Sequence, residues 1–183
     1  AVGLSRPHMP YRKPIMALLI SPLIVPIIII AAGMFFFYSH IGLAYTHLGV
    51  ILAHAVMGTP YVVITVTATL IGFDETLIRA SGSLGAKPLR TFFRVIMPLI
   101  TPGVISGALF AFITSFDEVV LIYFLADAEQ KTIPIQMWSG LRQQISPSIL
   151  AVATMLVTFS VILLVAVELL RRRSERLRTQ VIS

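Results

Sequence analysis

Four stretches of this sequence are long and apolar enough to cross a lipid bilayer, and they limit the possible folds more than any other feature. They run from about Ile15 to Tyr38, Leu48 to Phe73, Leu99 to Ala126 and Leu150 to Leu170. A hydrocarbon core of roughly 30 Å takes about 20 helical residues to cross. With 57% hydrophobic and 12% charged residues, the chain has too little polar surface for a water-soluble domain. The sequence therefore predicts an all-α, polytopic membrane bundle in which residues 1–183 form one domain.

The third stretch contains polar residues that set it apart from the other three. Ser115, Asp117 and Glu118 interrupt it about 18 residues after its start. Irregular backbone at membrane depth is tolerated only where protein or water surrounds it. We therefore expect one span that bends or breaks before a short apolar continuation.

Prolines and small residues within the stretches predict how the helices bend and pack. The first stretch contains Pro22 and Pro26, which kink membrane helices and leave backbone carbonyls free. Gly103, Gly107 and Ala111 recur at four-residue spacing in the third stretch. Because small residues on one face let two helices approach closely, this spacing predicts a helix-packing surface rather than a substrate site.

Basic residues are strongly biased toward one predicted side of the membrane. The segments 39–47 and 127–149 carry only Lys131 and Arg142. The bias predicts that both termini are cytoplasmic. It also explains the net charge of +6 by contact with membrane lipid, so nucleic acid is not an expected partner. The basic residues of the other side are Arg6, Arg12, Lys13, Arg79, Lys87, Arg90, Arg94, Arg171, Arg172, Arg173, Arg176 and Arg178.

The segment between the second and third stretches is too charged to span lipid. From Asp74 to Pro102 it reads DETLIRASGSLGAKPLRTFFRVIMPLITP. A short helix is expected from Thr76 to Leu84, because Gly85 can adopt the positive φ that ends a helix. Pro88 fits the first turn of a second helix that runs to about Ile96. The sequence thus predicts a helix-turn-helix on the cytoplasmic membrane surface.

This segment resembles the motif E-A-A, three residues, G, nine residues, I-x-L-P of permeases in binding-protein-dependent ABC importers. Two positions depart from the motif, since Arg79 stands where the family usually has glutamate and Ser81 replaces the second alanine. The spacing is kept throughout. The matching positions are Ala80 for the first alanine, Gly85 for the glycine, and Val95, Met97 and Pro98 for the final I-x-L-P.

The resemblance implies the type I permease fold, a bacterial inner-membrane location and transport by ATP-driven alternating access. Residues 76–96 would then be coupling helices that dock on an ATPase subunit. The implied partners are a homodimer of that ATPase, a second homologous permease and an external solute-binding protein, with no cofactor. The candidate coupling residues are Arg79, Ala80, Ser81, Gly85, Ala86, Pro88, Val95, Met97 and Pro98.

Three stretches of the chain resemble the polyamine branch of these permeases, which moves spermidine and putrescine. They are SPLIVPIIIIAAGMFFFY, ILAHAVMGTPYVVITVTATLIGFDETL and SFDEVVLIYFLA. Importers of opines, other amines, sulfate or ferric iron have similar spans and remain alternatives. Family members typically have six spans, so a chain with four that begins at Ala1 is expected to be an N-terminally incomplete copy.

Two acidic residues in the third stretch raise the question of the solute path. An acidic side chain at the bilayer centre costs roughly 2.5 to 3.5 kcal/mol, so Asp117 and Glu118 should face protein or water. In one interpretation they line the path and attract a cationic amine, with Phe116 and Tyr123 offering aromatic faces. In the other, the pair lies at the outer interface and caps a helix end. The sequence leaves both open.

Other polar residues have simpler interpretations. Trp138 is expected to anchor an interfacial helix, and His54 to make a buried hydrogen-bonded helix contact rather than a proton relay. GSLGAKP lacks the spacing of a phosphate-binding loop, so ATP should bind elsewhere. No metal-ligand spacing or catalytic constellation is present, and the chain has no cysteine. A secondary transporter or channel, and a membrane anchor or assembly protein, are the rival functions.

Overall fold

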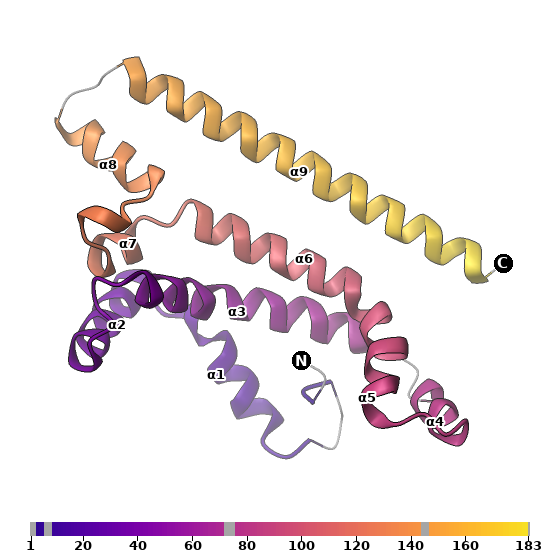
Figure 1. Ribbon diagram of the computed structural model, residues 1–183. Coiled ribbons are helices and arrows are strands. Elements are labelled where there is room, and N and C mark those ends of the chain that lie inside the picture. The colour runs from indigo at the N-terminus through magenta and orange to yellow at the C-terminus, as the bar shows by residue number, and fades with distance from the viewer. Residues whose placement is uncertain (1–2, 6–8, 72–75, 144–146, 183) are drawn as a thin grey trace.

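The computed structural model describes residues 3–5, 9–71, 76–143 and 147–182. This part of the chain is helical and contains no β-strand, which confirms the predicted all-α class. Figure 1 shows α3 and α6 side by side, with the long α9 running along them. The helices are α1 (Arg12–Ile24), α2 (Ile27–Ile41), α3 (His47–Ile71), α4 (Thr76–Ser83), α5 (Pro88–Thr91), η1 (Phe92–Ile96), α6 (Met97–Phe116), α7 (Val120–Leu125), η2 (Ala128–Gln130), α8 (Ile133–Gln143) and α9 (Pro147–Ile182).

The first apolar stretch forms two helices rather than one continuous helix. Helices α1 and α2 meet at an angle of 106°. Val25 between them is extended, with φ −77° and ψ 134°, because the ring of Pro26 disfavours helical backbone in the residue before it. Pro22, in contrast, lies inside α1 without ending it. The pair is therefore a broken span or a re-entrant segment.

Three further helical segments are long and apolar enough to cross a membrane. They are His47–Ile71, Pro88–Phe116 and Pro147–Ala166. These segments overlap the second, third and fourth predicted stretches. In Pro147–Ala166, no residue of the most apolar 18-residue segment is buried against the rest of the described chain. This helix can therefore contact lipid or another subunit.

Helices α3 and α6 pack closely because small residues line their contact. A Cβ atom added at Gly107 would lie 2.7 Å from Val62 Cα, and one added at Gly58 would lie 2.9 Å from Ala111 Cβ. Gly103 is similarly enclosed by α3. Real Cβ atoms do not approach backbone this closely, so the two helices can adopt this spacing only with glycine at these positions. The predicted packing role of the small residues is confirmed.

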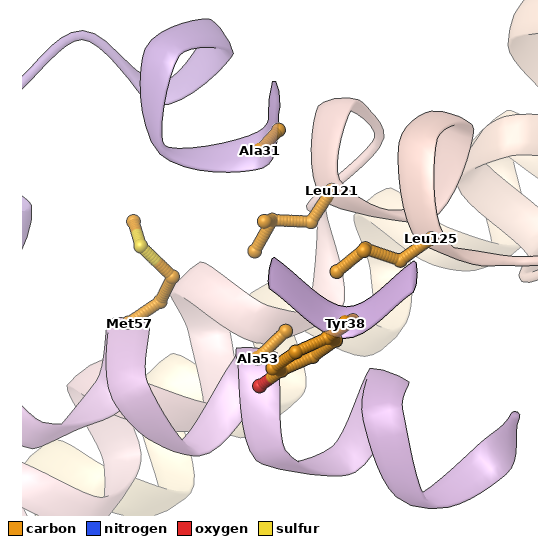
Figure 2. Packing of buried hydrophobic residues seen from close by; sticks show 6 residues of the cluster. All are labelled: Ala31, Tyr38, Ala53, Met57, Leu121 and Leu125. Carbon is orange, nitrogen blue, oxygen red and sulfur yellow. The ribbon is translucent and has the colours of Figure 1, made fainter. Parts of the chain in front are cut away.

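The third apolar stretch breaks between Phe116 and Val120, and the chain then forms the short helix α7. Leu121 and Leu125 of α7 are each only 1% exposed. Figure 2 shows them directed into a cluster formed with α2 and α3. The break therefore lies between one helix packed along α3 and another anchored in this core. The cluster consists of Ala31, Tyr38, Ala53, Met57, Leu121 and Leu125.

Candidate functional site

The helix-turn-helix of residues 76–96, which we call the elbow, has a complete helix-ending motif in the turn between α4 and α5. The N–H of Ala86 donates to the carbonyl of Ser81 at 3.0 Å, and the N–H of Gly85 donates to that of Gly82 at 2.9 Å. These two bonds define a Schellman motif. Gly85 has the φ of 78° that the motif requires, as the sequence predicts. Hydrogen bonds at the end of α4 thus fix the direction in which the chain leaves it.

A side-chain hydrogen bond also joins the two helices of the elbow. The hydroxyl of Ser81 donates to the carbonyl of Ile78 at 2.8 Å and lies 3.0 Å from the hydroxyl of Thr91, which is 6% exposed. Since a hydroxyl has one proton to donate, Thr91 is the donor in the second bond. The family's alanine could not accept it. Ser81, a departure from the motif, therefore braces α4 against α5.

The tip of the elbow is exposed and mixes apolar with basic residues. Leu84 is 89% exposed and Leu89 is 72% exposed. Among the predicted coupling residues, Ser81, Ala86 and Val95 are half-buried. The others are exposed, namely Arg79, Ala80, Gly85, Pro88, Met97 and Pro98. The elbow therefore offers an apolar surface with charged neighbours to a partner.

The second helix of the elbow does not end near Ile96 as expected. It continues into α6, and residues Pro88–Phe116 form one helical segment of 29 residues. The junction η1 is a π-helical turn in which the N–H of Met97 donates to the carbonyl of Phe92. This wider turn comes directly before Pro98, which has no N–H to continue the ordinary helical pattern. The elbow is thus directly connected to a predicted membrane span.

The two acidic residues at the break between α6 and α7 have different surroundings. Glu118 Oε1 accepts hydrogen bonds from the N–H groups of Val120 at 2.7 Å and Leu121 at 3.0 Å, so this side chain caps α7. Asp117 is exposed instead. The cap that the sequence suggested for both residues is therefore made by Glu118.

Asp117 lies in an open groove between the end of α6 and the helices α8 and α9. The groove has a volume of about 420 Å³. Phe116 and Trp138 provide aromatic surface there, and Phe116 also contacts Phe159 with ring centroids 5.6 Å apart. Tyr123 is 68% exposed on α7 but does not line this groove. The structure thus brings together Phe116 and Asp117, with Trp138 as an additional residue whose place here the sequence did not indicate.

His54 makes the hydrogen-bonded helix contact that the sequence predicts, although His54 and Ser115 are half-buried rather than buried. Its Nδ1 lies 2.8 Å from Ser115 Oγ, so a hydrogen bond joins α3 to the last turn of α6. Within the part of the chain that the structure describes, no three His, Asp or Glu residues are placed to hold a metal ion. Near the break, His54 thus makes a helix contact and Glu118 caps α7.

These features define a class of protein, a helical membrane protein with an exposed elbow attached to a spanning helix. Over residues 1–176 the sequence matches the family described as binding-protein-dependent transport system inner membrane component. The chain belongs to this family, which has the type I ABC permease fold. Membership assigns a role in membrane transport rather than catalysis, and it does not favour a secondary transporter or channel.

Individual relatives agree with this assignment. The spermidine/putrescine transport system permease protein PotC of Haemophilus influenzae is 28% identical over 174 residues, which cover 95% of this chain and 68% of that protein. The putrescine transport system permease protein PotI of Escherichia coli is 36% identical over 105 residues, 57% of this chain and 37% of its own length. A probable sulfate transport system permease protein of Chlorokybus atmophyticus is 31% identical over 134 residues, 72% of this chain and 47% of its own. The chain spans about two thirds of the length of its PotC relatives.

Proposed function

We propose that this chain is a permease subunit of an ABC importer that moves a polyamine or a related amine across the bacterial inner membrane. The observation that carries the proposal is the elbow, a motif-matched helix turn continuous with a spanning helix. An ATPase homodimer binds the elbow, a second homologous permease completes the pathway, and an external solute-binding protein delivers the amine. The domain comprises residues 1–183, with four spans that include the broken pair α1 and α2.

The coupling residues act as a unit because the elbow is stiff. The Schellman motif, the Ser81–Thr91 bond and the helical junction leave few places where an imposed motion can be absorbed. The helix from Pro88 to Phe116 is about 40 Å long at 1.5 Å per residue. Its far end lies beside Asp117. Closure of the ATPases is thus transmitted along this continuous helical segment, through its π-helical turn, to the break, where the solute path changes from inward to outward facing.

Charge and the arrangement of the helices support one orientation in the membrane. In Figure 1 the elbow and the C-terminal end of α9 lie at one end of the bundle, and α7 and α8 lie at the other. The end with the elbow carries the predicted majority of basic residues, which favours the cytoplasm. Both termini are assigned to that side. The groove with Asp117 is then at the outer side.

A cationic amine fits the break better than an anion does. Asp117 offers an exposed carboxylate in the groove that Phe116 and Trp138 also line, and both a carboxylate and an aromatic ring attract ammonium ions. A sulfate ion would be repelled by the same carboxylate, although one relative is named as a probable sulfate permease. The names of PotC and PotI support the amine. Tyr123 contributes its exposed ring from α7, and Glu118 contributes from the break by capping α7.

The proposal is tested by transport in proteoliposomes. The complete complex that copurifies with this chain is reconstituted with its solute-binding protein, and uptake of labelled spermidine and putrescine is measured with and without enclosed ATP. We expect uptake only with ATP, and stimulation of ATP hydrolysis by the amine-loaded binding protein. Amine uptake that proceeds equally without ATP, or ATP-driven uptake of sulfate and no amine, contradicts the proposal.

A further inference from the structure

The hydrogen bond between His54 and Ser115 lies next to the break. Its loss would therefore change the position of Asp117. Ser115 belongs to the last turn of α6 and is two residues from Asp117. His54 is on α3, and its Nδ1 lies 2.8 Å from Ser115 Oγ. The bond therefore holds the chain just before the break to a helix that does not itself break.

The other side of the break is held by the same helix. Ala53, the neighbour of His54, packs in the buried cluster with Leu121 and Leu125 of α7. Figure 2 shows Ala53 in this cluster, beside Tyr38 of α2. Consecutive residues of α3 are thus linked to both sides of the break, His54 by a hydrogen bond and Ala53 through the buried cluster.

The His54–Ser115 bond lies next to a close contact between α3 and α6. One helical turn away, Gly58 and Ala111 are so close that a Cβ on the glycine would lie 2.9 Å from the alanine Cβ. Side chains at i and i+4 share a helix face, so this contact lies in line with the bond. The bond gives each of these half-buried polar groups a partner within the protein, which lipid would not provide.

We infer that His54 is a positioning residue for the solute site, acting through its hydrogen bond to Ser115 to hold Asp117 in the groove beside Phe116 and Trp138. This inference rests on the proposed function, since it assumes that Asp117 meets the solute. His54 itself does not line the groove. Its loss should weaken solute recognition while leaving the turnover of bound solute nearly unchanged.

The transport test uses substitutions that keep or remove the atom in the Nδ1 position. The amide of asparagine branches at Cγ and places a polar atom near Nδ1, whereas glutamine places it near Nε2. In the reconstituted complex, His54→Leu, His54→Gln and Ser115→Ala should each raise the KM for amine uptake about fivefold, the effect of an interhelical hydrogen bond. The maximal rate per complex should change less than about twofold, and His54→Asn should restore the KM.

The double variant shows whether His54 and Ser115 affect KM through one shared hydrogen bond or independently of each other. His54→Leu with Ser115→Ala should raise KM no more than either change alone, because both remove the same bond. A KM increase equal to the product of the two single effects would overturn the inference. So would a His54→Asn variant as defective as His54→Leu.

A second measurement decides the inference without relying on transport. The chain has no cysteine, so a spin label can be placed on it at one chosen position. A label at Asp117→Cys should become more mobile when Ser115→Ala is added, whereas a label at Tyr123→Cys should not, because α7 is anchored by its buried leucines. Equal mobility at position 117 with and without Ser115 overturns the inference. Absence of amine uptake by the unmodified complex contradicts only the proposed function.

Discussion

Replacing Gly85 by valine is expected to reduce ATP-driven uptake by about ten- to a hundredfold while the chain still inserts into the membrane. Gly85 has a φ of 78°, in the left-handed region, although nothing lies within 4 Å of an added Cβ. A β-branched residue there costs roughly 1 to 3 kcal/mol of strain, so the Schellman turn opens and the elbow changes direction. Uptake and stimulated ATP hydrolysis in proteoliposomes measure the effect.

Gly82 supplies a matched control for this variant. It is also exposed and also has open space around an added Cβ, but its φ is not positive. Gly82→Val should therefore retain most uptake, and Gly85→Asn should retain more than Gly85→Val because asparagine tolerates the left-handed region. If Gly85→Val transports as well as Gly82→Val, the direction of the elbow is not what couples the subunits.

Asp117→Asn should raise the KM for amine uptake by about ten- to a hundredfold. The exposed carboxylate offers a charge-assisted hydrogen bond to an ammonium group, and such bonds contribute roughly 1.5 to 3 kcal/mol. Asparagine keeps the size of the side chain but loses the charge. Initial uptake rates over a range of spermidine concentrations in the reconstituted complex measure the change.

Glu118→Gln is the control for the loss of an acidic residue at the break. Glutamine retains an oxygen that can accept from the N–H groups of Val120 and Leu121, so the cap on α7 persists. The KM should rise less than about threefold, and the double variant with Asp117→Asn should resemble Asp117→Asn alone. Wild-type kinetics in the double variant would remove the chemical argument for a cationic solute.

The sequence predicted features that depend on one residue type or on simple periodicity. Gly85 was identified because few other residues adopt its φ, and the helix-packing role of Gly103 and Gly107 follows from the spacing of small residues, whereas their partner helix α3 does not. The break after Ser115 follows from the polar residues there. These local rules act regardless of which helix lies nearby, so they can be read without the fold.

The remaining features depend on how distant segments meet. The bend of 106° at Pro26 is not fixed by proline alone, since Pro22 lies inside α1. The different roles of Asp117 and Glu118 depend on the direction in which α7 leaves the break. The Ser81–Thr91 bond requires α5 to fold back on α4, and the continuity of α5 with α6 depends on a π-helical turn that no sequence pattern indicated.

The most direct test of the coupling role is to place a cysteine at the tip of the elbow. Leu84 is 89% exposed, and the chain's lack of other cysteines makes Leu84→Cys a single reactive site on it. In the assembled complex we expect a short bifunctional reagent to link this position to the ATPase subunit, with a yield that changes when ATP binds. Labelling of the same cysteine in intact cells by a reagent that cannot enter the cytoplasm would contradict the account, because it would place the elbow outside.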